Sequence, residues 1–98
     1  MGNGHLLRIK NKRVPVLLTS KTIQLRQTKY LVHDELTLRH FLIFLRNNRY
    51  IYVNDSDGFY ITCNGNIPSS SVLMVDLYRC CDEQGYLNLS IERSQFFG

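Results

Sequence analysis

The sequence has no hydrophobic run long enough to cross a bilayer. Its longest uninterrupted apolar stretch is Phe41–Leu45, whereas a membrane-spanning helix needs about 20 apolar residues. The N-terminus also lacks the apolar segment of a secretory signal peptide. We therefore expect a cytoplasmic protein.

Cysteine is scarce and poorly placed for disulfide bonds. Three cysteines, Cys63, Cys80 and Cys81, cannot all pair, and a bridge between two adjacent cysteines would be strained. This excludes a disulfide-stapled secreted domain. A reducing compartment fits better.

Recognisable catalytic and metal-binding patterns are also missing. The histidines His5, His33 and His40 are scattered, and Cys80-Cys81 lacks the C-x-x-C spacing of zinc or redox sites. The stretch 55–58 begins like a calcium loop, but its glycine comes too early and no glutamate closes the loop. We expect no enzymatic activity, no metal and no cofactor.

The net charge of +4 comes from twelve lysines and arginines that are spread along the chain without a basic tract. The six tyrosines and five phenylalanines fall mostly at apolar strand and helix positions, where packing explains them. A nucleic-acid-binding surface would combine both features on one face, so no nucleic-acid partner is expected. A length of 98 residues with 44% hydrophobic residues suits one globular domain.

The first half of the chain predicts a hairpin followed by a helix. Val14–Thr19 reads as a strand, in which Pro15 indicates an edge or a strand start. A polar turn over 20–27 leads to an antiparallel strand, Thr28–Val32. Thr37 is a helix N-cap, and an apolar stripe with helical spacing follows it at Leu38, Phe41, Leu42 and Leu45, ending near Asn47-Asn48.

The second half predicts a strand, a short helix and a last strand. The strand Phe59–Cys63 ends in the turn 64–66, and Ser69–Ser71 caps a short helix through residues 73–78. The last strand is Tyr86–Ile91. The β-rich stretch 50–53 is either an extra strand paired with Phe59–Cys63 or an extended loop.

This order of elements predicts an α+β fold, a β-grasp roll like that of ubiquitin, in which a mixed sheet of four to five strands packs on one long helix. We divide the chain into an N-terminal extension (1–12), the ubiquitin-like domain (13–92) and a C-terminal tail (93–98).

The chain ends on Gly98, behind a predicted strand and a short tail, which is the layout of a ubiquitin-like modifier. A C-terminal carboxylate that passes through an adenylate and thioesters to an amine is least obstructed when its residue has no side chain. A terminal glycine equally fits a small frayed end. The tail alone leaves both interpretations open.

Four blocks in order carry a more specific resemblance: Arg13–Val16, Lys29–Val32, the stretch from Ile67-Pro68 to Leu77-Tyr78, and Phe97-Gly98. Together they resemble the autophagy-related protein 8 family, the GABARAP type of ubiquitin-like modifier. The resemblance implies that activating and conjugating enzymes join Gly98 to phosphatidylethanolamine, which anchors the protein to autophagosomal membrane. It also implies that a deconjugating cysteine protease releases the protein from the lipid.

The resemblance also implies a groove for acidic-aromatic receptor peptides along the second strand. By matching position, the pocket for the ligand's aromatic residue is formed by Pro15, Leu17, Lys29, Leu31 and Tyr86. The aliphatic pocket is formed by Tyr30, Val32, Leu36, Phe41 and Phe44. Arg13, Lys29 and Arg46 attract acidic flanking residues. Each apolar residue of these sets is also explained by core packing.

Departures from the family pattern mark a divergent member. Only twelve residues precede Arg13, where the family carries two helices, and His33 stands where the family has proline. The last third resembles autophagy-related protein 12 almost as well, which implies conjugation to a protein lysine. A third possibility is a β-grasp domain that binds peptides without being conjugated.

Overall fold

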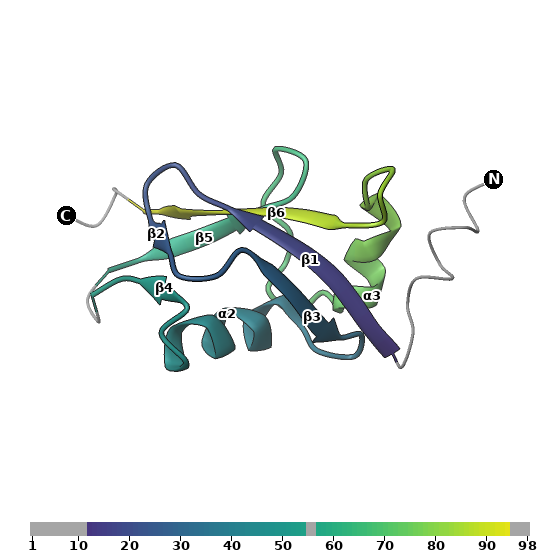
Figure 1. Cartoon of the computed structure of the whole chain (residues 1–98), viewed down its shortest axis with the longest axis horizontal. Helices are drawn as coiled ribbons and strands as arrows, with labels where there is room; N and C mark the ends of the chain where they lie inside the picture. Colours follow the sequence, from purple (N-terminus) through teal and green to yellow (C-terminus); the bar gives the residue numbers. More distant parts are fainter. Residues whose placement is uncertain (1–11, 55–56, 95–98) are drawn as a thin grey trace.

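A mixed four-stranded sheet forms the centre of the protein, seen in this computed structural model, which describes residues 12–54 and 57–94 (Figure 1). The strands lie in the order β3 (Lys29–His33), β1 (Arg13–Thr19), β6 (Leu87–Arg93) and β5 (Phe59–Thr62). β1 pairs with β6 in parallel, and the other two pairs are antiparallel. This confirms the predicted α+β ubiquitin-like roll.

β1 and β3 form the predicted antiparallel hairpin, with Val16 opposite Tyr30. Alternating burial along β1 puts Val14, Val16 and Leu18 completely inside. The interpretation of Pro15 needs correction, because β1 is a central strand. Proline is tolerated there because pairing with β6 begins only at Val16, so its missing N–H faces no partner strand.

Helix α2 (Leu38–Asn47) packs on one side of the sheet (Figure 1). Thr37 is its N-cap, as predicted: its hydroxyl accepts the His40 N–H (3.1 Å), while His40 Nδ1 accepts the Thr37 N–H (3.4 Å). This reciprocal capping box satisfies two backbone donors at the helix start. The helix therefore begins where the sequence places it.

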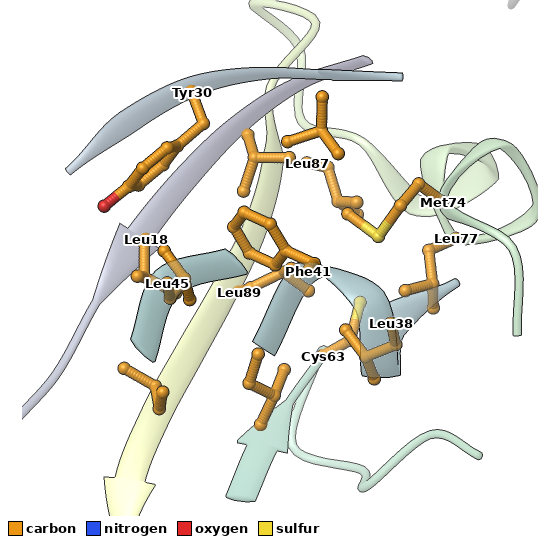
Figure 2. Packing of buried hydrophobic residues seen from close by; sticks show 14 of the residues in the cluster. Leu18, Tyr30, Leu38, Phe41, Leu45, Cys63, Met74, Leu77, Leu87 and Leu89 are labelled. Atoms are coloured by element: carbon orange, nitrogen blue, oxygen red, sulfur yellow. The ribbon is translucent and has the colours of Figure 1, made fainter. Parts of the chain in front are cut away.

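The core lies between α2 and the sheet, and Figure 2 shows the ring of Phe41 among Leu18, Leu87 and Leu89. Fully or almost fully buried side chains come from every main element; the largest are Tyr78, Phe41, Leu18, Leu45, Met74, Leu87, Leu89 and Ile91. At about 25 cal/mol per Å² of apolar surface, this cluster is the main stabilising term of the fold.

The short second helix, α3 (Met74–Leu77), continues into the 3-10 turn η2 (Tyr78–Cys80). The predicted serine cap at 69–71 is wrong, because the N-cap is Leu73 and no side chain caps the helix. The neighbouring backbone takes this role: the Met74 N–H donates to Leu36 O (2.8 Å) and the Val75 N–H to Asp34 O (3.1 Å). A tertiary contact thus satisfies the orphan donors of the first turn.

The stretch 50–53 does contain a strand, β4 (Ile51–Tyr52), so it is neither the extended loop nor the partner of Phe59–Cys63 that were the two alternatives. β4 pairs with β2 (Gln24–Leu25), which lies inside the stretch expected to be a turn, and β5 pairs with β6. Burial of Ile51 explains the choice, since this pairing brings its side chain onto the core.

Three sequence-based expectations lie outside the described residues, namely the N-terminal extension up to residue 11, part of the turn at 55–56, and Gly98. β6 runs as far as Arg93, which is the first residue of the segment assigned to the tail. Neither α2 nor α3, the helices in the described ranges, has the length and hydropathy of a bilayer-crossing segment.

Candidate functional site: an open sheet edge and its hollow

β3 lies at one edge of the four-stranded sheet and pairs only with β1 among the described strands. The Leu18 N–H donates to Thr28 O (2.7 Å), and the Asp34 N–H donates to Lys12 O (2.9 Å). Because antiparallel hydrogen-bonded pairs recur at every second residue, these two bonds fix which backbone groups of β3 face β1. The N–H and C=O groups of Lys29 and Leu31 point to the open edge.

One of these groups already has a partner from the chain itself. The Gln27 side-chain amide donates to the Lys29 carbonyl (2.7 Å), in the way that an added strand would. An extended ligand that pairs with the whole of β3 must therefore displace Gln27. Sequence analysis missed this residue, which carries no signal beyond being polar and close to the strand.

Side chains of β3 alternate between the two faces of the sheet, as the strand pattern predicts. Leu31 is 68% exposed and Lys29 is exposed, whereas Tyr30 and Val32 are buried. An exposed leucine on an unpaired edge is the combination expected of a strand-addition site.

A hollow of about 480 Å³ adjoins this edge and is lined by Pro15, Gln27, Lys29, Tyr30, Leu31, Phe44 and Tyr86. Four of the five residues expected in the aromatic pocket are in this list. The fifth, Leu17, lies opposite Lys29 in the β1–β3 register and is half-buried, but it is not among the lining residues. The Lys29 ammonium sits 5.8 Å from the centre of the Tyr86 ring, within reach of a cation–π contact.

The residues expected in the aliphatic pocket divide between groove and core. Tyr30 and Phe44 line the hollow, and Phe44 is 40% exposed. Phe41 and Val32 are buried in the core, and the half-buried Leu36 packs against that core from outside the hollow. The structure thus brings two of these five side chains to the same hollow as the aromatic set.

Tyr30 connects the hollow to the core. Its ring makes edge-on contacts with Phe41 (5.5 Å between centroids), Tyr50 (5.6 Å) and Phe44 (6.4 Å). Burial, followed by the nearby Tyr50 hydroxyl, raises the pKa of Tyr30 to about 12. The neutral phenol donates to Gln27 O (2.8 Å), so this wall of the hollow is rigid and uncharged at physiological pH.

The three cations expected to attract acidic residues are at different places. Lys29 lines the hollow, whereas Arg13 lies opposite His33, at the far end of the β1–β3 pair. Arg46 borders a separate hollow of about 390 Å³ together with Arg49. Of the three, Lys29 alone lines the hollow beside the edge.

The loop 82–86, which carries Tyr86, was not singled out from the sequence. Asp82 accepts the backbone N–H groups of Gln84 (2.9 Å) and Tyr86 (2.9 Å), and Gly85 completes the turn with φ +88°. A signal was present in the sequence, because aspartate at the first and glycine at the fourth position of Asp82–Gly85 is typical of a β-turn.

A polar hollow of about 670 Å³ lies elsewhere, along β5, β6 and the β1–β2 loop. Its carboxylate, Glu92, accepts hydrogen bonds from the Thr22 hydroxyl (2.8 Å), the Ser90 hydroxyl (2.7 Å) and the backbone N–H groups of Lys21 and Thr22. Because these donors engage Glu92 fully, we assign it to holding the loop against β6 and not to binding.

Metal-ligand atoms come together at one place in the described ranges, the turn His33-Asp34-Glu35, where they lie within 4.8 Å of one another. His33 Nδ1 already accepts the Glu35 N–H (3.2 Å). His33 and Asp34 are half-buried and Glu35 is exposed; since these are three consecutive residues and His33 Nδ1 is already occupied, we assign no metal centre to this turn.

Comparison with known proteins identifies the family. The family model described as autophagy protein Atg8, ubiquitin-like, matches residues 3–98. Human microtubule-associated protein 1 light chain 3 gamma is 32% identical over 76 residues, which cover 76% of this chain and 50% of that protein. The chain thus spans about half the length of the curated relative it matches.

Solved structures share the fold. Trypanosoma brucei ATG8 has a TM-score of 0.76 at 24% identity, with 99% of this chain and 85% of the other covered. Plasmodium falciparum Atg8, solved in complex with a P. falciparum Atg3 peptide, has a TM-score of 0.69 at 24% identity, with 91% and 83% covered. Since the family model matches almost the whole sequence, and the sheet and its helices have the corresponding fold, the chain belongs to the Atg8 family of ubiquitin-like autophagy proteins.

Proposed function

We propose that this chain is an autophagy modifier that is conjugated through Gly98 to phosphatidylethanolamine and that recruits receptor peptides at the open edge of β3. It is then a substrate of activating, conjugating and deconjugating enzymes, and not an enzyme itself. It is cytoplasmic before conjugation and sits on autophagosomal membrane afterwards. The observation that carries the proposal is the β3 edge, which pairs with no second strand in the described ranges, together with the apolar hollow beside it.

The spacing between β6 and Gly98 supports the conjugation step. β6 ends at Arg93, and Gly98 comes five residues later in the sequence. An extended chain covers about 3.3–3.6 Å per residue, so this segment is long enough to carry the glycine well away from the sheet. A glycine carboxylate is unhindered in acyl transfer between cysteine thiols.

The groove supports the recruitment step. An incoming extended peptide can pair with the backbone of Lys29 and Leu31, and its alternate side chains then face the hollow. Pro15, Leu31 and Tyr86 offer apolar surface to an aromatic residue, and Lys29 offers a positive charge to an acidic neighbour. The ligand class that fits is an acidic-aromatic peptide.

The conjugating enzyme is a further candidate partner for the same edge. The P. falciparum Atg8 structure contains a peptide of P. falciparum Atg3. We extend this to our chain as a proposal: a peptide of its own conjugating enzyme binds the β3 edge and competes there with receptor peptides.

Conjugation is tested with purified activating and conjugating enzymes, ATP and liposomes that contain phosphatidylethanolamine. We expect a lipidated band of higher electrophoretic mobility, preceded by a thioester on the conjugating enzyme. Deletion of Gly98 should abolish both, whereas Gln95→Ala, a change in the same tail, should retain both.

Two outcomes would replace the proposal. An adduct on a protein lysine, with no lipid adduct, would show the mode of conjugation expected from the resemblance to autophagy-related protein 12. Absence of a thioester with every cognate enzyme, together with peptide binding that survives deletion of Gly98, would show a non-conjugated peptide-binding domain.

A further inference from the structure

We infer that Asp82 is a positioning residue for the groove: its carboxylate holds the 82–86 loop so that the Tyr86 ring forms one wall of the hollow, and it thereby sets the affinity for an aromatic ligand residue. Asp82 is not among the residues that line the hollow, so it acts through Tyr86. The inference rests on the proposed function, since it requires the hollow to be the ligand site.

One carboxylate oxygen of Asp82 organises the backbone of the loop. Asp82 Oδ1 accepts the N–H groups of Gln84 (2.9 Å) and Tyr86 (2.9 Å). The Asp82 N–H in turn donates to Tyr86 O (2.8 Å). Tyr86 is therefore tied to Asp82 through both of its backbone polar groups, which fixes the direction in which its side chain leaves the loop.

The other carboxylate oxygen ties the loop to the sheet. Asp82 Oδ2 accepts a hydrogen bond from Asn88 Nδ2 (2.7 Å), and Asn88 is the second residue of β6. The same amide donates more weakly to Tyr86 O (3.3 Å). Asp82 and Asn88 thus flank Tyr86 in sequence and clamp it between the turn and the strand.

Core contacts hold the back of the loop. The Gly85 N–H donates to Asp82 O (3.0 Å), and Gly85 O accepts the hydroxyl of the buried Tyr78 (2.8 Å). With the rear of the turn attached to the core, the Asp82 contacts control the remaining freedom of Tyr86. Hydrogen bonds, first from the Tyr86 backbone and then from Asn88, lower the pKa of Asp82, so the carboxylate is ionised and a strong acceptor.

The position of the Tyr86 ring also affects the open edge of β3. Its ring lies beneath the Lys29 ammonium, 5.8 Å away, and Lys29 belongs to β3. A displaced Tyr86 ring would therefore alter both a wall of the hollow and the position of the Lys29 ammonium beside it. The backbone groups of β3, which an added strand uses, do not depend on this loop.

This separation defines the experiment. Binding is measured for an acidic peptide with an aromatic anchor and for the same peptide with alanine at the anchor. Asp82→Ala should weaken the aromatic peptide about tenfold, the equivalent of one charged hydrogen bond, and the alanine peptide less than about twofold. Asp82→Asn keeps an oxygen acceptor for the two N–H groups and should restore most of the affinity.

Two further variants complete the design. Gln84→Ala is the matched control, because Gln84 joins the hydrogen bonds through its backbone N–H and the substitution retains that group. Asn88→Ala removes the hydrogen bond to Asp82 Oδ2 and the weaker one to Tyr86 O, and it takes the place of Asp82→Ala if that variant does not fold. We expect about a two- to threefold loss, confined to the aromatic peptide. Equal losses for the two peptides, or none, would overturn the inference.

An NMR readout in the free protein separates this inference from the proposed function. The Tyr86 ring should shift the resonances of the Lys29 ε-methylene, and Asp82→Ala should abolish that shift. If the wild type binds neither peptide, the groove function fails, while loss of the ring shift in Asp82→Ala still supports the loop contact. A ring shift that persists in Asp82→Ala refutes the positioning role, whatever the peptides do.

Discussion

Phe41 and Phe44 lie three residues apart on α2 and serve different surfaces. Phe41 is completely buried, whereas Phe44 is 40% exposed and lines the hollow. Their rings are nevertheless stacked, with centroids 6.5 Å apart. The helix thus joins a core position to a groove position through one aromatic contact.

Alanine substitutions should separate the two roles. Phe41→Ala should lower the free energy of unfolding by about 3–5 kcal/mol, because it leaves a cavity at the centre of a small core. Phe44→Ala should cost less than about 1 kcal/mol but weaken binding of an aromatic-anchored peptide several-fold. Urea denaturation and peptide titration measure the two effects. A larger loss of stability for Phe44→Ala would contradict the assignment.

The ionisation of Glu92 should make the folding stability depend on pH in the acidic range. Burial by itself would raise the pKa of Glu92, but hydrogen bonds, led by those from the Ser90 and Thr22 side chains, outweigh it and lower the pKa from 4.5 to about 2. A group whose pKa is lower in the folded state stabilises the protein fully above its unfolded value. This contribution should disappear as the pH falls from about 4.5 to about 2.

Glu92→Gln tests this dependence. The variant should be less stable than wild type at neutral pH by about 1–3 kcal/mol, since charge-assisted hydrogen bonds are weakened. The difference should shrink on acidification through that window, as followed by urea denaturation at several pH values. Thr22→Val removes one hydroxyl donor to Glu92 and also the acceptor of the Arg93 N–H, so only the pH-dependent part of its effect, which should be intermediate, reports on Glu92. A constant difference at all pH values would exclude Glu92 as the titrating group.

At the scale of elements, the orientation of β3 decides which of its residues can lose an N–H. The Leu31 N–H faces the open edge, whereas the Val32 N–H faces β1. Proline is compatible with an edge strand only where no ladder bond is lost. Adjacent positions should therefore respond differently to the same substitution.

Leu31→Pro should leave the protein folded and weaken peptide binding about tenfold or more, because the ligand loses a backbone donor and a side-chain contact. Leu31→Ala is the control that removes the side chain alone, and it should weaken binding less. Val32→Pro should destabilise the fold itself. Circular dichroism and peptide titration distinguish the three. Unchanged binding by Leu31→Pro would show that ligands do not add to this edge.

At the scale of the whole molecule, the three cysteines differ in how deeply their thiols are buried. Cys80 is exposed, Cys81 is half-buried and Cys63 is buried in the cluster drawn in Figure 2. Burial, followed by the nearby Cys80, raises the pKa of Cys63. Its thiol is therefore both inaccessible and protonated at neutral pH.

Thiol labelling with mass-spectrometric detection should show this order. In the native protein Cys80 should react at least about tenfold faster than Cys63, because the thiolate is the reactive form. The rate for Cys63 should rise steeply across the urea unfolding transition. Rapid labelling of Cys63 in the native state would contradict its burial.

Elements with strong local signals could be predicted from the sequence. Thr37 and the apolar stripe behind it place α2, and alternation places β1, β3 and their hairpin. The serine cap of α3 could not be judged locally, because the backbone at Asp34 and Leu36 supplies its acceptors. The β2–β4 pair was missed since two-residue strands carry no periodicity.

Some residues of the candidate site could likewise be predicted from the sequence, and others could not. Lys29, Leu31 and Tyr86 were found through resemblance, and strand alternation predicts that Lys29 and Leu31 share one face of β3, which the structure shows to be the exposed one. Gln27 and Asp82 were not: Gln27 bonds the Lys29 carbonyl two residues away and Asp82 the Tyr86 N–H four residues away, but a polar loop residue does not itself show which backbone group it will bind. Helical spacing put Phe41 on the apolar stripe of α2 and left Phe44 off it, whereas the match by position assigned Phe41 and Val32 to the pocket although both are buried.

Local chemistry thus explains the helix cap, the strand alternation and the family blocks, because those signals act between residues close along the chain. The clamp on Tyr86 is local, within residues 82–88, whereas the open edge of β3 and the hollow beside it arise from contacts between segments far apart in the sequence. Such contacts depend on which faces remain uncovered once the core has closed. A pattern of residue types does not encode that outcome by itself.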